Sequence, residues 1–215
     1  TQEESLYYSI LPTATQYARN ALFAGLLPLE IQKKFPSKWK NEDDQGSKNK
    51  FEQDFLNDNL SRNNISCKSS YNKITNLENG KKLVSNFSNL LTNQFNVVVY
   101  NFVDMLSHAR TDMEVIRELA DDESAYRSLT LSWFEHSALF DLFKLIADNN
   151  CEVIITTDHG TIKVNEPSKV VGDRNTNSNL RYKQGKNLNY NDKDVLAIRN
   201  PDEVYLPRMN VSSTY

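Results

Sequence analysis

The sequence is poor in cysteine, with only two in 215 residues. Cys67 and Cys151 lie far apart and form no C-x-x-C pair, so we expect two reduced thiols rather than a disulfide or a cysteine metal cluster. No apolar run is long enough to cross a bilayer, and the first residues carry neither a basic start nor an apolar segment. These absences indicate a cytoplasmic protein without a membrane partner.

An excess of positive charge is also lacking. Lysine and arginine number 25 against 28 aspartates and glutamates, which gives a formal net charge of −3. This balance argues against nucleic-acid binding through bulk charge, although a local basic pocket remains compatible with it. The length and the 39% of hydrophobic residues fit one domain with a core of its own.

Two apolar segments each lead into an acid and a histidine. The run Val153–Ile155 predicts a buried strand, and Asp158-His159-Gly160 follows it. Residues 95–103 predict a central parallel strand, after which Asp104 and His108 would share one face of a helix. Taken singly, Asp-His-Gly also fits a polar turn and His108 also fits a helix surface. Together the two pairs predict a metal site beyond the carboxyl ends of the strands.

The N-terminal region predicts a phosphate site beside a helix. Residues 5–11 read as a strand that Pro12 ends, and residues 16–26 have helical spacing. Thr15 would lie at the start of this helix, where unpaired N–H groups and the positive end of the dipole suit a phosphate. Thr13 or Thr15 would equally suit an N-cap, and the local sequence leaves both interpretations open.

The remaining segments are less regular. Residues 40–50 predict a mobile surface insertion. His136 is interpreted as a structural or exposed histidine. From residue 163 onward, cations and amides around Arg174 and Arg181 predict either a lid that binds an anion through arginine forks or a solvated loop. The other expected elements are a strand at 65–68, helices at 80–91 and 128–148, and short strands at 194–198 and 204–206.

The assembled residues resemble the alkaline phosphatase superfamily, in which a Ser or Thr nucleophile precedes a helix and two acid-histidine pairs end central strands. Residues 11–20 and 179–183 resemble its PglZ domains, and closely the output domains of PorX-type response regulators of type IX secretion. The resemblance covers nearly the whole chain. It implies an α/β fold with a central, mostly parallel sheet flanked by helices, an irregular insertion and a basic lid.

The resemblance also implies roles for individual residues. Two metal ions are expected, Zn²⁺ or alternatively Mn²⁺, because the ligands are carboxylates and imidazoles. Thr15 would attack phosphorus to give a phosphothreonine that water then hydrolyses, with Thr13 as its rival. The implied assignments are Asp104 and His108 for one metal, Asp158 and His159 for the other, Thr15 as a further ligand, and Arg19, Arg174 and Arg181 for substrate phosphate.

Members of the superfamily also use an aspartate at the end of an N-terminal strand and a late histidine followed by glycines. Neither is found in residues 1–215, so we expect a fragment whose missing ligands lie beyond both ends. The implied function is a phosphodiesterase acting on small cyclic or linear oligonucleotides, with an upstream receiver domain, a homodimer and control of type IX secretion. The alternatives are a non-catalytic module that binds signalling proteins and keeps its metal site for structure, and a metal-dependent phosphomutase.

Overall fold

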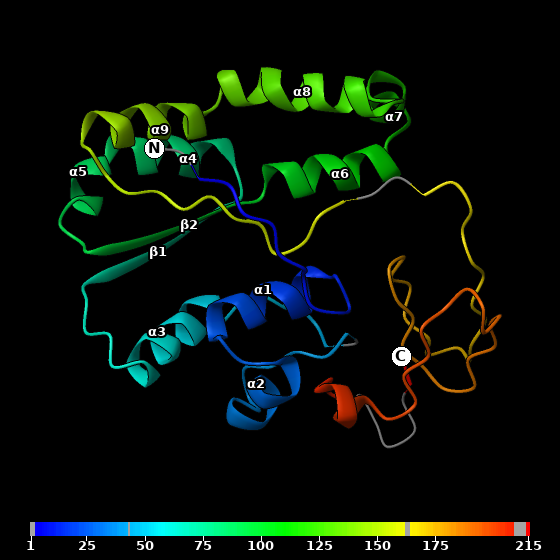
Figure 1. Ribbon diagram of the computed structural model, residues 1–215. Helices are drawn as coiled ribbons and strands as arrows, with labels where there is room; N and C mark the ends of the chain where they lie inside the picture. The colour runs from blue at the N-terminus through cyan, green and yellow to red at the C-terminus, as the bar shows by residue number, and fades with distance from the viewer. Residues whose placement is uncertain (1–2, 43, 162–163, 209–213) are drawn as a thin grey trace. The chain divides into compact units, whose positions relative to one another are not determined.

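The computed structural model describes residues 3–42, 44–161, 164–208 and 214–215 (Figure 1). The chain divides into two compact units, one made of residues 1–65 and 155–215 and the other of residues 66–154. We call them the terminal unit and the central unit. Each unit has helices and buried side chains of its own.

Among its described residues, the terminal unit has the helices α1 (Thr15–Ala24), α2 (Pro28–Lys34) and α3 (Glu52–Arg62) and the short 3₁₀ helix η1 (Pro201–Val204). The helix predicted at 16–26 is confirmed by α1. It ends at Gly25, whose φ of 57° lies in the left-handed region and whose N–H donates to the carbonyl of Ala21. The buried hydrophobic side chains of this unit include Tyr17, Ile31, Trp39, Phe55 and Leu206.

The central unit contains a two-stranded parallel sheet. Strand β1 (Ser69–Ile74) pairs with β2 (Phe95–Tyr100) from Ser69 opposite Phe95 to Ile74 opposite Tyr100. Its helices are α4 (Leu77–Ser85), α5 (Phe87–Leu90), α6 (Phe102–Asp112), α7 (Glu114–Leu119), α8 (Glu123–Glu135) and α9 (Ala138–Asp148). The sheet and helices α4, α5 and α9 pack around Ile74, Leu83, Phe87 and Leu142. The predicted α/β class with a parallel sheet is therefore confirmed. No helix within the described ranges has both the length and the apolar character that a membrane span requires.

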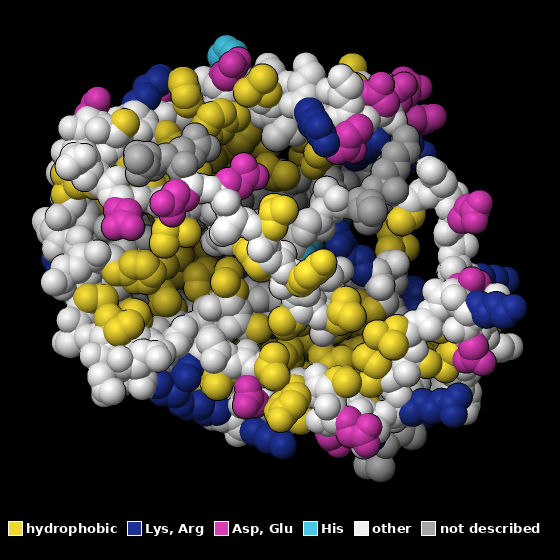
Figure 2. All heavy atoms as spheres, in the orientation of Figure 1, with side chains coloured by type: hydrophobic (Ala, Val, Ile, Leu, Met, Phe, Trp, Pro, Cys, Tyr) yellow, Lys and Arg dark blue, Asp and Glu magenta, His cyan; other side chains and the backbone are white. Residues whose placement is uncertain are grey.

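Several predicted strands are wrong. Residues 5–11, 65–68, 153–155, 194–198 and 204–206 form no strand in the part of the chain that the structure describes. Ile154 and Ile155 are 85% and 78% exposed, and Figure 2 shows many hydrophobic side chains open to solvent on the face in view. An apolar run predicts burial, but a strand also needs a neighbour that satisfies its backbone groups. Residues 153–155 lie outside the β1–β2 ladder.

Two predicted helices are each divided. The expected helix at 80–91 starts earlier and breaks at Asn86, between α4 and α5. The expected helix at 128–148 breaks after His136, where the Ser137 hydroxyl accepts a hydrogen bond from the Phe140 N–H at 3.3 Å and caps α9. Strand β2 ends at Tyr100 instead of residue 103, because α6 begins at Phe102.

Segment 40–50 lies on the surface and is tied to α1. Residues 44–47 are exposed, whereas Asn49 is buried and donates from Nδ2 to Asn20 Oδ1 at 3.1 Å. Gln16 Nε2 donates to the Lys40 carbonyl at 2.6 Å. Asp43 lies outside the described residues, and mobility of the segment stays a prediction. The predicted lid begins within residues 162–163, which are also outside the described ranges, and contains an isolated antiparallel bridge between Val171 and Asn189.

Candidate active site

Thr15 is the first residue of α1. The N-cap is Ala14, which offers no side-chain hydrogen bond, so neither Thr13 nor Thr15 is the cap that the sequence allowed. The first N–H groups of a helix have no partner within it, and the positive end of its dipole lies there. The Thr15 hydroxyl therefore stands at a position that attracts anions, and it is not used for capping.

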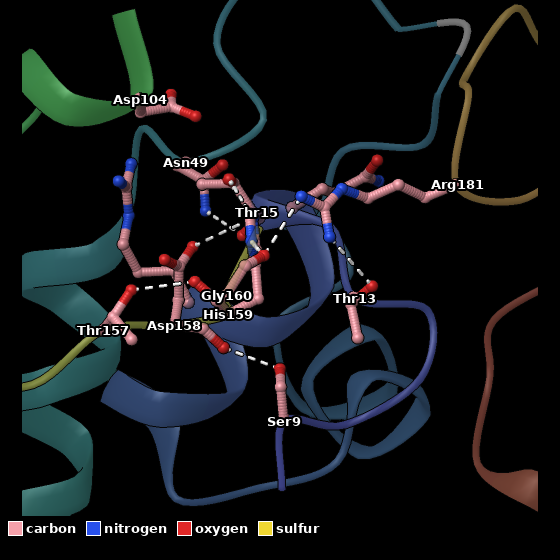
Figure 3. A network of polar contacts seen from close by, with 12 residues as sticks. Ser9, Thr13, Thr15, Asn49, Asp104, Thr157, Asp158, His159, Gly160 and Arg181 are labelled. Carbon is pink, nitrogen blue, oxygen red and sulfur yellow. Dashed lines mark hydrogen bonds and ion pairs between the residues drawn. The ribbon is translucent and has the colours of Figure 1, made fainter. Parts of the chain in front are cut away.

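The partner of the Thr15 hydroxyl is His159 (Figure 3). Thr15 Oγ1 lies 3.1 Å from His159 Nε2, and His159 Nδ1 lies 3.1 Å from the Gly160 carbonyl oxygen. Because a carbonyl only accepts, His159 Nδ1 donates to it, and in the neutral imidazole Nε2 then presents its lone pair toward Thr15. This nitrogen can accept the proton of Thr15 or bind a metal ion.

Asp158 supplies a buried oxygen beside this pair. Its Oδ2 lies 3.8 Å from His159 Nε2 and has no hydrogen-bond partner among the described residues. The Asp158 carbonyl accepts from Ser9 Oγ at 2.6 Å, which fixes the turn. Burying a carboxylate oxygen without a donor is costly, and a cation would remove that cost. Thr15 Oγ1, Asp158 Oδ2 and His159 Nε2 thus form a donor set that fits a metal ion.

The second pair belongs to the central unit. Asp104 lies in the first turn of α6, and its Oδ1 is 3.5 Å from His108 Nε2, so the prediction that they share one helix face is confirmed. The side chain of His108 is 75% exposed. Within the described ranges, no group of three or more His, Cys, Asp or Glu side chains is placed to hold an ion. His136 is exposed, as expected.

The three predicted arginines have different surroundings. Arg181 donates from Nη1 to Thr13 Oγ1 at 3.2 Å and from Nη2 to the Gly160 carbonyl at 3.1 Å, so it joins the Thr13 turn to the Gly160 turn. Arg19 instead pairs with the buried carboxylate of Glu52. Arg174 lines a polar pocket of about 360 Å³ together with Glu42 and residues 175–178.

Sequence reasoning missed the residues that support the site. Asn49 Nδ2 donates to the Thr15 carbonyl at 3.0 Å, Ser9 holds the Asp158 turn, and Glu52 engages Arg19. These are single polar residues in loops or at a helix start. No local spacing connects them to the motifs, because each contact spans more than 30 positions in the chain.

A known protein family matches nearly the whole chain. The BREX system PglZ alkaline phosphatase-like domain matches residues 1–211. No curated protein matches the chain. The family match contains Thr15, both acid-histidine pairs and Arg181, which the structure distributes over the two units. The chain belongs to the PglZ family of alkaline phosphatase-like domains.

Proposed function

We propose that this chain is the catalytic part of a zinc-dependent phosphodiesterase in which Thr15 is the nucleophile. The observation that carries the proposal is the 3.1 Å contact between Thr15 Oγ1 and His159 Nε2 at the N-terminus of α1. Membership of an alkaline phosphatase-like family supports phosphoester hydrolysis in general. The hydroxyl, the imidazole lone pair and the helix start together suit attack on a phosphoryl group.

Two zinc ions belong to the proposal, and Mn²⁺ is the alternative metal. Asp158, His159 and Thr15 would hold one ion, and Asp104 and His108 would hold the other. The unpartnered Asp158 Oδ2 supports the first site. When bound, the ions would act as Lewis acids that lower the pKa of the threonine hydroxyl and stabilise the phosphoryl oxygens. Each set needs more ligands to reach the usual coordination number.

The proposed hydrolysis has two steps, in which bonds to phosphorus form and break at Thr15. Thr15 Oγ1 forms a bond to phosphorus while its proton passes to solvent, and the bond from phosphorus to the leaving oxygen breaks. Water then cleaves the Oγ1–phosphorus bond and restores the hydroxyl. The Nε2 lone pair of His159 cannot bind a metal ion and accept the Thr15 proton at the same time. We assign it to the metal ion, and the hydrogen bond from Nδ1 to the Gly160 carbonyl would orient the ring.

The proposal also covers the class of substrate and the proteins with which the domain acts. The resemblance of residues 11–20 and 179–183 to PorX-type output domains favours small cyclic or linear oligonucleotides as substrates. It also favours an upstream receiver domain, a homodimer and control of type IX secretion. A non-catalytic module that binds signalling partners is the second candidate. The placement of Thr15 favours the enzyme, because a purely structural metal site needs no hydroxyl at the helix start.

The test uses the zinc-loaded full-length protein and bis-p-nitrophenyl phosphate. Thr15→Ala should lower turnover by about 10³-fold or more, and Thr15→Ser should keep part of the activity. Because Ala14 is the N-cap, Thr15→Ala removes no capping bond. Thr92→Ala, which removes an exposed threonine of the central unit, serves as the matched control. Removal of zinc by a chelator should also stop turnover. Unchanged hydrolysis by Thr15→Ala would refute the nucleophile, and no hydrolysis by the zinc-loaded wild type would favour the binding module.

A further inference from the structure

The segment that carries Arg181 is anchored to α1 by three tyrosines, Tyr17, Tyr182 and Tyr215, which we call the tyrosine cluster. The Tyr182 ring meets the Tyr17 ring edge-on at 5.5 Å and stacks on Tyr215 at 6.0 Å. The Tyr182 hydroxyl donates to Glu42 Oε2 at 2.8 Å. Burial, and then the Glu42 charge, raise the pKa of Tyr182, so this hydroxyl stays a donor. Tyr17 lies on the same helix as Thr15.

Arg181 is the residue next to this anchor. Its backbone N–H donates to Asn179 Oδ1 at 2.9 Å, so the chain is held on both sides of the Arg181 side chain. Figure 3 shows the guanidinium between the Thr13 turn and Gly160. The two donor nitrogens contact Thr13 Oγ1 and the Gly160 carbonyl, which already accepts from His159 Nδ1.

These contacts form a chain of hydrogen bonds whose two ends, Thr13 and Thr15, are joined through the backbone of Ala14. It runs from Thr13 through Arg181 to the Gly160 carbonyl, on to His159 Nδ1, and from Nε2 to Thr15 Oγ1. The guanidinium is planar and rigid, so its two donors fix the spacing of the two turns in a way that a single ammonium group would not. The spacing between the Thr15 hydroxyl and His159 Nε2 depends on the same two turns.

We infer that Arg181 is a positioning residue that sets the Thr15–His159 geometry, and that Tyr182 acts through it. This inference rests on the proposed function and adds a role that differs from binding substrate phosphate. A misplacement of about 1 Å at a reacting group lowers the rate about 100-fold, whereas uniform substrate binding is expressed in KM. Loss of Arg181 should therefore appear in kcat rather than in KM.

The first experiment compares Arg181→Ala, Arg181→Lys and the wild type with bis-p-nitrophenyl phosphate and zinc. Arg181→Ala should lower kcat about 10-fold to 100-fold at a nearly unchanged KM. Arg181→Lys should fail to restore it, because it keeps the charge and loses the fork. Arg199→Ala, which removes an exposed arginine of the same segment, is the control. A raised KM at unchanged kcat, restored by lysine, would make Arg181 a phosphate ligand and overturn the inference.

The second experiment tests whether Tyr182 acts through Arg181. Tyr182→Phe keeps the ring and removes the bond to Glu42, so kcat should fall about threefold to tenfold. In the Arg181→Ala background the same change should have no further effect on kcat. Additive losses in the double variant would show that Tyr182 does not work through the guanidinium.

A third readout does not depend on hydrolysis. In metal-free protein carrying ¹⁵N-histidine, the signals of His159 are identified as those that His159→Gln removes. The wild type should show the neutral Nδ1–H tautomer, and Arg181→Ala should show a mixture of tautomers. If this change occurs but the zinc-loaded wild type hydrolyses nothing, the proposed function fails and the positioning inference stands. If hydrolysis proceeds and Arg181→Ala changes neither kcat nor the tautomer, the inference alone is refuted.

Discussion

The ion pair between Arg19 and Glu52 offers a sharp test of how the terminal unit holds α1. Glu52 is the first residue of α3, and its side chain is 1% exposed, while that of Arg19 is 12% exposed. Arg19 lies one helical turn after Thr15. Replacing Glu52 by alanine would remove the carboxylate that pairs with the Arg19 guanidinium. The positive charge would then lie at a largely buried, poorly solvated position without that carboxylate, which is costly.

We expect Glu52→Ala to lower the free energy of unfolding by about 3–5 kcal/mol. For a chain of this length that loss corresponds to a Tm lower by about 6–20 °C. The signal is Trp39 fluorescence during urea unfolding, because Trp39 is buried in the same unit. The other tryptophan, Trp133, lies in the central unit, so a Trp133→Phe background isolates the terminal unit.

The matched control removes both charges. Arg19→Met with Glu52→Leu should be more stable than Glu52→Ala alone, because apolar residues of similar size carry no desolvation penalty. A loss below about 1 kcal/mol in Glu52→Ala would mean that the pair behaves like a surface ion pair, and the reasoning would be wrong. A double variant less stable than the single variant would contradict it as well.

Three further predictions concern stability. Burial alone would raise the pKa of Asp58, but hydrogen bonds from Arg62 and Lys34 outweigh it and lower the pKa. The ionised Asp58 carboxylate therefore stabilises the fold fully above its ordinary pKa of about 3.9, and this stabilisation is lost as the pH falls through the lowered pKa. Asp58→Asn should accordingly lower Tm at pH 7 and have no effect on Tm in strong acid. The tyrosine cluster has raised pKa values through burial, so it should stabilise the fold below about pH 10 and lose that contribution as the pH rises above this. Ultraviolet absorbance should show these three phenols ionising only with unfolding, and early ionisation would contradict the packing. Gly25→Ala should destabilise by about 1–2 kcal/mol or more, since its φ is positive and a Cβ would meet a side-chain oxygen at 2.8 Å. Gly46→Ala, with positive φ and no neighbour within 4 Å, should cost less in the same urea titration.

Sequence patterns predicted the elements whose signals are local. Helix α1 followed from helical spacing and Gly25, and the Asp104–His108 face followed from a separation of four residues. The run Val153–Ile155 failed as a strand because pairing partners are not encoded in hydropathy. Strand β1 was missed because its burial is partial at nearly every position and its sequence is largely polar.

Local sequence patterns predicted some residues of the candidate site but not their long-range partners. The residue types of Thr15, Asp158 and His159 pointed to metal and phosphate chemistry, and the structure places these three together. The partners of the arginines could not be predicted, because Arg181 meets a hydroxyl 168 positions away and Arg19 meets a carboxylate 33 positions away. Contacts of that kind depend on tertiary packing alone.

The most direct measurement is to trap the reaction on Thr15. Full-length zinc-loaded protein would be mixed with bis-p-nitrophenyl phosphate, quenched in acid within a turnover, digested and analysed by fragment mass spectrometry. Attack on this diester expels one p-nitrophenolate, so we predict a p-nitrophenyl phosphate ester on Thr15 that is absent from Thr15→Ala. The same adduct on Thr13, or measurable turnover without an adduct on any threonine, would contradict the assignment of Thr15 as the nucleophile.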